Sequence, residues 1–408
     1  MAHVNRRIGK SSETANPNAD GTGGGVLDAF LHDYFNRSGN LSNVPGVATR
    51  AIVASGGVTN EYTVSGDVYK AHIFTGSGTF AVTSIGQGED VDTNTVEYLV
   101  VGGGGAGGDG TNSGGGGGAG GFRTNVPGTP GNHTTTNAFT ISAGNYTVTV
   151  GAGGGGPSGD ADAGQNGSDS VLGPPSSPTR IVATGGGGGG NESDGKTGGS
   201  GGGGGSAADN VTKAGGANTN VTTPSPWPGP SSQGNFGGAG RHAPGVWEGG
   251  GGGGGAGASG QDASQTPTPT AGAGGIGIRS LIAGPDYPIG APGPGSTTNG
   301  WFAGGGGGYG NSSGDGGAYN GSSVISGGPY AGAGAGVPSS VRNALGGTGS
   351  GGGGSNNAET GYGGSGIVVV RYKIASTNTA KATGGNISFY NGKTIHAFTS
   401  SGTFTVTA

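Results

Sequence analysis

The stretch VEYLVVGGGGAGG, residues 96–108, joins an apolar strand pattern to a glycine tract with no spacer between them. Val and Tyr favour β-strands, whereas consecutive glycines form helices poorly. The same junction recurs at YTVTVGAGGGG (146–156) and RIVATGGGGGG (180–190), and the last large tract ends in the apolar run IVVVRYKI (367–374). The repeated junction predicts a mainly β protein in which strands alternate with glycine tracts, and it marks 367–374 as a buried strand.

Glycine supplies 110 of the 408 residues, and only 10% of the residues are charged. Flexible linkers are one interpretation of such tracts. Their number, similar length and low charge favour a second interpretation, ordered packing side by side. Polyproline II-type helices of glycine have three residues per turn, so they can hydrogen-bond to lateral neighbours and satisfy their backbone groups. The predicted fold class is mainly β, with β-sandwich or jelly-roll-like strands, packed polyglycine II helices and one short N-terminal helix.

An internal repeat connects the two ends of the β region. VYKAHIFTGSGTFAVTS (68–84) returns as GKTIHAFTSSGTFTVTA (392–408), with His72 aligned on His396. Each copy predicts two strands joined by a glycine-containing turn. The predicted organisation is a segment 1–57, a β-hairpin module 58–95, a glycine-rich domain 96–374 and a C-terminal hairpin 375–408 that repeats 69–83.

Residues 1–57 contain the predicted helix, which covers 26–37 between flanking glycines. It could anchor the chain to a larger assembly or pack on the chain's own β domain, and the pattern favours neither. The candidate anchor residues at helical spacing are Val26, Leu27, Phe30, Leu31 and Tyr34.

Composition and motifs argue against several functions. The net charge of −5 gives no basic stripe for nucleic acid. No apolar stretch is long enough for membrane insertion, and the N-terminus has no signal-peptide pattern. The glycines after Val101 lack the helix that a nucleotide fingerprint requires, and the histidines are scattered singly. We therefore expect no enzyme activity, cofactor or catalytic residue; a calcium site in the loop Asp160–Asp169 is left open against a plain polar loop.

Two proline-rich loops, 222–247 and 284–302, contain every tryptophan of the chain. Trp, Tyr and Arg dominate binding hot spots, so these loops are candidate contact surfaces for a receptor or partner. The alternative is that their aromatic residues cover the glycine-rich body, which we favour for Trp247 and Trp301. The candidate contact residues are Trp227, Phe236, Arg241, His242, Asp286 and Tyr287.

At VEYLVVGGGGAGG, GGGGAGGFRT, YTVTVGAGGGG and GIVVVRY the sequence resembles the glycine-rich domains of phage tail fibres and adhesins. A related region occurs in anaplastic lymphoma kinase-type receptors. The resemblance covers about residues 61–408, and the strand–glycine junctions and the repeated hairpin carry most of it. It implies a β-sandwich combined with packed polyglycine helices, and a virion protein, assembled in the host cytoplasm, that recognises its host through loops.

Partners implied by the resemblance are other phage virion proteins and a host cell-surface polysaccharide or protein. A capsid or neck appendage without receptor binding is an alternative. A bacterial surface or matrix protein is another, although the missing export signal counts against it. The oligomeric state stays open, with a homotrimer as one option.

Overall fold

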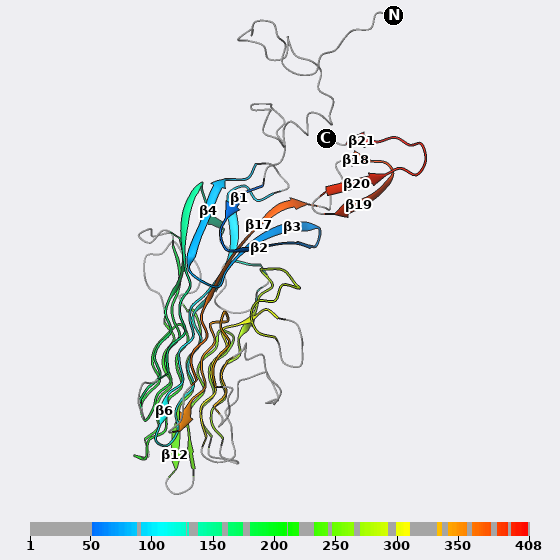
Figure 1. The fold of residues 1–408 in the computed structure, drawn as a ribbon. Coiled ribbons are helices and arrows are strands. Elements are labelled where there is room, and N and C mark those ends of the chain that lie inside the picture. The colour runs from blue at the N-terminus through cyan, green and yellow to red at the C-terminus, as the bar shows by residue number, and fades with distance from the viewer. Residues whose placement is uncertain are drawn as a thin grey trace, which may run out of the picture.

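The computed structural model is mainly β and contains several antiparallel sheets (Figure 1). Its described residues include no helix, and hence none that could cross a membrane. The predicted helix over 26–37 and its five anchor residues lie outside this part. The described residues are 51–406 except 88–90, 128, 130–137, 157–161, 174–179, 210, 220–231, 244–246, 265–269, 293–298, 311–332, 337–341, 357–360, 377–381 and 391–392.

The larger sheet consists, in order, of β2 (Val58–Val64), β3 (Asp67–Phe74), β17 (Ile367–Ser376), β5 (Thr95–Val101) and β7 (Phe122–Thr124), with β8 (Phe139–Thr140) also beside β5. All of its pairs are antiparallel. β17 lies between β3 and β5, and its residues 367–370 are buried. Because both faces of β17 are covered, apolar residues occupy successive positions, and the predicted buried strand is confirmed.

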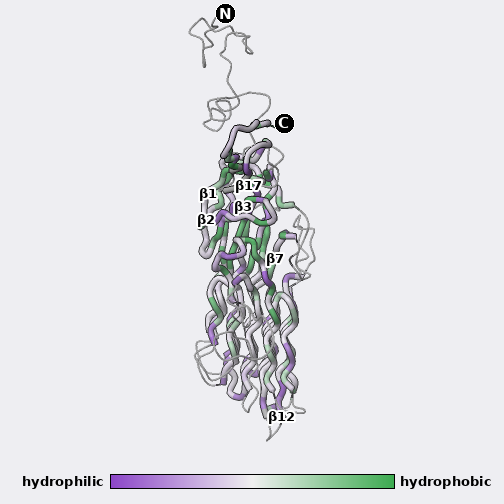
Figure 2. The backbone as a smooth tube through the Cα atoms, turned by 90° about the vertical axis from the view of Figure 1, so that its right-hand side faces the viewer, coloured by the Kyte–Doolittle hydropathy of each residue, from purple (hydrophilic) through white to green (hydrophobic). Residues whose placement is uncertain are grey.

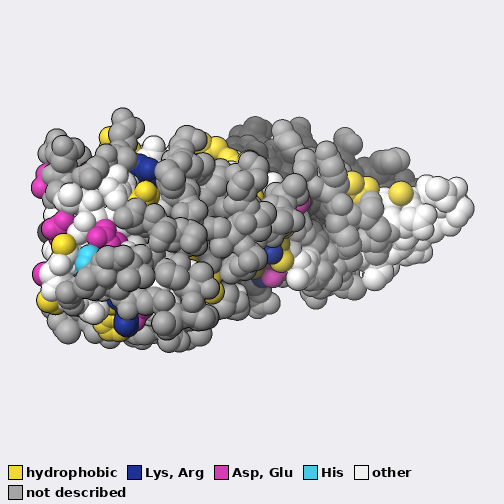
Figure 3. All heavy atoms as spheres, turned by 90° about the horizontal axis from the view of Figure 1, so that it is seen from below, with side chains coloured by type: hydrophobic (Ala, Val, Ile, Leu, Met, Phe, Trp, Pro, Cys, Tyr) yellow, Lys and Arg dark blue, Asp and Glu magenta, His cyan; other side chains and the backbone are white. Residues whose placement is uncertain are grey.

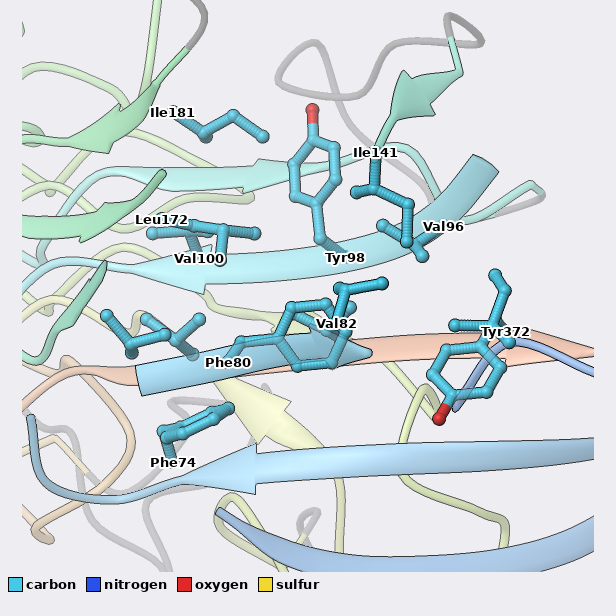
Figure 4. Close-up of a cluster of buried hydrophobic side chains, with 14 of the residues drawn as sticks. Phe74, Phe80, Val82, Val96, Tyr98, Val100, Ile141, Leu172, Ile181 and Tyr372 are labelled. Carbon is cyan, nitrogen blue, oxygen red and sulfur yellow. The ribbon is translucent and has the colours of Figure 1, made fainter. Parts of the chain in front are cut away.

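A second antiparallel sheet packs against one face of the larger sheet. It consists, in order, of β1 (Val53–Ser55), β4 (Gly78–Ser84), β9 (Gly144–Thr149), β10 (Ser170–Leu172) and β11 (Ile181–Ala183). Side chains from both sheets, among them Phe80, Tyr98 and Tyr372, form one buried cluster (Figure 4). The alternating apolar positions of these strands build the main hydrophobic core.

The opposite face of the larger sheet is covered by a later part of the chain. This part includes β14 (Ile278–Arg279), which pairs with β15 (Trp301–Phe302). Ile282 and Phe302 from this region join Val369 in a second buried cluster. The larger sheet therefore has an apolar core on each side.

The glycine tracts run side by side below the sheets in Figure 1. Every third N–H of residues 102–108 donates to a carbonyl of residues 115–121, at 2.8 to 3.0 Å. The N–H groups between them donate alternately to residues 165–168 and 361–364. The N–H groups of one tract therefore donate to three neighbouring tracts in turn, and the pattern repeats every three residues.

The tract 114–121 lies at the centre of this arrangement. Its N–H groups donate to three tracts, and its carbonyls accept from three others. These six neighbours are residues 184–190, 251–254 and 349–355, which accept, and residues 102–108, 200–203 and 306–309, which donate. We call the laterally bonded tracts the glycine lattice. Figure 2 shows that hydrophobic residues concentrate at the sheet end, while most of the lattice is nearly neutral in hydropathy.

Close approach explains why the lattice uses glycine. A Cβ added to Gly117 would lie 2.1 Å from the carbonyl oxygen of Gly105, and one added to Gly253 would lie 2.0 Å from that of Gly117. These neighbours are backbone atoms, which cannot move aside as a flexible side chain can. Backbone hydrogen bonding between tracts therefore replaces side-chain packing in this half of the protein.

His72 supports a prediction about pH. The ring is buried in the main core, with Nδ1 2.7 Å from the Gly56 carbonyl oxygen and Nε2 3.0 Å from the Tyr372 hydroxyl. Burial lowers the pKa of His72 below its ordinary value of 6.5. The unfolded chain then takes up a proton before the folded protein does, so stability is intact above that pH and falls below it.

We expect the urea midpoint of the protein to fall between about pH 7 and about pH 5, and to fall less in His72→Gln. His396→Gln, at the equivalent position of the repeat, controls for the substitution itself. An unchanged pH dependence in His72→Gln would contradict the assignment.

Candidate functional site

The candidate contact residues that the structure describes lie on three separate parts of the molecule. Arg241 and His242 lie at the lattice end far from the two large sheets (Figure 1). Phe236 lies on the outside of the lattice, and Asp286 and Tyr287 lie beside β2. Trp227 is outside the described residues. The structure therefore does not unite these residues in one site.

The hairpin at the lattice end consists of β12 (Arg241–Ala243) and β13 (Trp247–Gly249). Both strands continue lattice tracts, so the lattice fixes where the hairpin starts and ends. Arg241 Nη2 lies 3.5 Å from Asp262 Oδ2, and both side chains are exposed. The other oxygen of Asp262 accepts a hydrogen bond from the Ala239 N–H at 2.8 Å. One carboxylate thus caps a lattice backbone group and pairs with the arginine.

His242 and Glu248 face each other across the hairpin. His242 Nδ1 lies 3.2 Å from Glu248 Oε1, and both side chains are largely buried. Ser206, from the adjacent lattice tract, donates to the Arg241 carbonyl at 3.0 Å. These contacts hold the hairpin backbone and leave Arg241 as its outward-facing cation.

Further charged residues surround this hairpin, and Figure 3 shows acidic, basic and histidine side chains gathered at this end. Lys213 Nζ lies 2.7 Å from Asp209 Oδ2. The hydrogen bond from Lys213 is the main cause that lowers the pKa of Asp209. Ser355 donates to Asp109 at 2.7 Å, where β16 (Ser355–Asn356) runs parallel to β6 (Asp109–Gly110). The lattice end therefore presents a mixed and mostly paired set of charges.

Phe236 is 55% exposed, five positions before Arg241 on the same outer tract. Its carbonyl accepts from the Gly260 N–H at 2.9 Å, so its backbone belongs to the lattice. The neighbouring Asn235 donates its side-chain amide to the carbonyls of Gly255 and Ala256 at 2.8 and 3.0 Å. An apolar ring is thus displayed on a backbone that is bonded on both sides.

Asp286 and Tyr287 lie on a turn that packs against the larger sheet. Asn60 of β2 donates to the Ala283 carbonyl at 2.8 Å, and the Tyr62 hydroxyl donates to the Ile282 carbonyl. Tyr287 is half-buried against the second hydrophobic cluster, whereas Asp286 is exposed. The two residues form a small surface of their own, away from β12.

A polar network on the outer part of β17 was missed by the sequence analysis. Arg371 pairs with Glu97 across β17 and β5, donates to the Tyr62 hydroxyl at 2.9 Å, and lies 4.5 Å from the Tyr69 ring centroid. Burial is the main cause that raises the pKa of Tyr62. A sequence signal exists, because the apolar run VEYLVV carries one acidic residue and IVVVRYKI carries two basic residues.

The sequence left open a calcium site in the loop Asp160–Asp169. Among the described residues, no group of three or more His, Asp or Glu side chains is arranged to hold a metal ion. Of the candidate calcium loop, Asp160 lies outside the described residues. Asp169 accepts a hydrogen bond from the Gly185 N–H at 2.9 Å, and the Asp162 carbonyl accepts one from Asp109. Both aspartates therefore take part in the lattice.

Comparison with models of protein families assigns most of the chain to a family. A family model described as a glycine-rich domain matches residues 75–373, which include β4 to β16 and the whole central lattice tract. No curated protein matches the chain. The matched region covers well over half of the 408 residues, and the chain belongs to the glycine-rich domain family.

Proposed function

We propose that the protein is a structural component of a phage virion, of tail-fibre or adhesin type, which presents loops for host-surface recognition. The observation that carries the proposal is the glycine lattice, which joins many short tracts through backbone hydrogen bonds and bears polar and aromatic side chains at its far end and outer surface. A support of this kind holds a contact surface at a fixed distance from the core, as an attachment protein requires.

We further propose that the lattice tracts are polyglycine II helices and that the two large sheets form a β-sandwich. The three-residue period of the hydrogen bonds and the six neighbours of residues 114–121 support the first assignment. The shared cluster of side chains from both sheets supports the second. A jelly roll, which also packs two antiparallel sheets face to face, is the alternative arrangement of the strands.

The proposed role is non-enzymatic and located in the virion. Its partners would be other virion proteins, through the candidate anchor in residues 1–57, and a host polysaccharide or protein, through the loops. Paired charges and an exposed phenylalanine suit such contacts, because aromatic residues and arginine contribute most to binding. A capsid or neck appendage is the competing role, and adsorption to cells discriminates between the two.

Arg241→Ala combined with Phe236→Ala tests the adhesin role. The Arg241–Asp262 pair is exposed and worth about 0–1 kcal/mol, so the variant should fold normally. We expect the labelled full-length chain to adsorb to some strains of a bacterial panel, and the double variant to bind those cells about tenfold more weakly.

Lys213→Ala is the matched control, because it removes another charge pair at the lattice end. Equal loss in both variants would indicate a general charge effect. Failure of the protein to adsorb to any strain would count against an adhesin and favour an appendage.

A further inference from the structure

The C-terminal part of the chain is a second copy of the first module. The first module comprises β1 to β4, residues 53–84. The C-terminal module comprises β18 (Ala382–Thr383), β19 (Asn386–Tyr390), β20 (Lys393–Ala397) and β21 (Thr405–Val406). In both, the outer strands pair with each other and the inner strands form a hairpin. The sequence repeat therefore extends to strands that sequence comparison did not detect.

Local geometry matches between the copies. Gly56 and Gly384 have φ values of +107° and +109°, and a Cβ on either would lie 2.0 Å from a carbonyl oxygen, that of Thr79 or Thr403. Both positions require glycine for the same reason, because this φ and this contact exclude a side chain.

The aligned histidines occupy equivalent environments. His72 and His396 each place Nδ1 2.7 Å from the carbonyl oxygen of their module's glycine. Their rings meet Phe80 and Phe404 edge to face, at centroid distances of 5.1 and 5.0 Å. The C-terminal module is thus folded like the first one around its histidine.

Burial differs sharply between the copies. In the first module these apolar side chains belong to the main core, covered by β5, β9 and β17. In the C-terminal module they are exposed. The exposed fractions are 4% for Phe74 against 41% for Phe398, 1% for Phe80 against 54% for Phe404, and 4% for Val82 against 59% for Val406.

The strand edges differ in the same way. β3 is paired on both sides, by β2 and β17, and β4 is paired by β1 and β9. Among the described residues, β20 is paired only by β19, and β21 only by β18. An unpaired edge beside an exposed apolar face is a template for another strand.

We propose that a β-strand of a partner polypeptide adds antiparallel to the free edge of β20 and covers this face, as β17 does for β3. The first module defines its chemistry. Val370 lies opposite His72, and the Tyr372 hydroxyl lies 3.0 Å from His72 Nε2. In the described structure, His396 makes its one hydrogen bond through Nδ1. The added strand is therefore expected to have β-branched residues at alternating positions, and a tyrosine two positions after the residue that lies opposite His396.

A second copy of this chain fits the face less well. Its own strand with this pattern, β17, is already held between β3 and β5. In Figure 1 the C-terminal module lies at the opposite end from β12, so a partner here would leave the lattice end accessible. The inference does not depend on the proposed adhesin role.

The test uses the full chain and a fluorescent peptide of residues 365–376, SGIVVVRYKIAS, with lysines added at its ends for solubility. We expect saturable binding by fluorescence anisotropy. Phe404→Asp or Val406→Asp in the protein should weaken it at least about fiftyfold, because each puts a charge on the covered face. Phenylalanine in place of the tyrosine of the peptide should weaken it about five- to tenfold, through loss of the bond to His396.

Leu345→Asp is the matched control, since Leu345 is comparably exposed but outside the module. It should bind the peptide like the unmodified chain, and equal weakening by Leu345→Asp would overturn the proposal. Sedimentation of the chain alone gives the other decisive outcomes. Self-association abolished by Phe404→Asp would show that a second copy covers the face. Absence of both peptide binding and self-association would show that the face takes no added strand.

Discussion

Gly117→Ala is expected to destabilise the protein by more than about 3 kcal/mol, enough to leave much of the chain unfolded. The added Cβ would lie 2.1 Å from the Gly105 carbonyl oxygen and 2.8 Å from the carbonyl carbon of Ala106. Moving the tracts apart would break hydrogen bonds on several sides of residues 114–121, each worth about 1 kcal/mol net. The predicted loss combines overpacking with these broken bonds.

Urea denaturation and amide hydrogen exchange of residues 114–121 measure the effect. Gly76→Ala is the control, because a Cβ there would meet nothing within 4 Å. We expect the control to change stability by less than about 0.5 kcal/mol. If Gly117→Ala were as stable as the control, or if these amides exchanged at coil rates in the unmodified chain, the tracts would not be packed as described.

Phe80→Ala is expected to cost about 3–5 kcal/mol, the range for a buried phenylalanine. Its ring lies in the main core against His72 and Tyr146, between the two large sheets. Deletion leaves a cavity among strands from distant parts of the chain, which cannot all collapse into it. The measurement is again the free energy of unfolding in urea.

The internal repeat supplies an unusually close control for this substitution. Phe404 contacts the histidine of its module as Phe80 does, but its ring is exposed. Phe404→Ala should therefore change the free energy of unfolding of the free chain by less than about 0.5 kcal/mol. Similar losses in both variants would mean that the C-terminal module is covered in the free protein.

Strand positions were predictable because their signal is local. The apolar run in β17, the two strands within 68–84 and the aligned histidines can all be read from neighbouring residues. The expectation that these two strands form a hairpin was wrong, because β3 pairs with β2 and β17 while β4 pairs with β1 and β9 in the other sheet. The choice of neighbours in the lattice could not be predicted. Residues 102–108 bond to residues 361–364, more than 250 positions away, and no side chain in either tract encodes that pairing.

The candidate site was predicted less completely than the fold. Composition identified residues rich in contact chemistry, yet Arg241 and Tyr287 lie on different parts of the structure. Distance between loops depends on the lattice arrangement, which the sequence does not specify. The Arg371–Glu97 pair was missed because cross-strand register is a tertiary property, although the two opposite charges were visible.

Uniform backbone chemistry in the lattice also creates a problem of alignment. If the tracts are polyglycine II helices, as proposed, sliding one tract along its neighbours by a single turn, about 9 Å, would restore the same pattern of donors and acceptors. Only positions with a side chain that bonds to one particular neighbour can distinguish the correct register. Gln233 is one, since its buried side chain accepts from the Thr184 N–H at 2.8 Å and donates to the Thr184 hydroxyl at 3.0 Å.

Asp169 and Asn166 act similarly, each accepting from a single glycine N–H of the tract 185–190. Together with the strands, these few side chains fix the register of the tracts and prevent one tract from slipping along another. Because the glycines are alike, we expect the lattice to assemble correctly only after the sheets have fixed the strand ends.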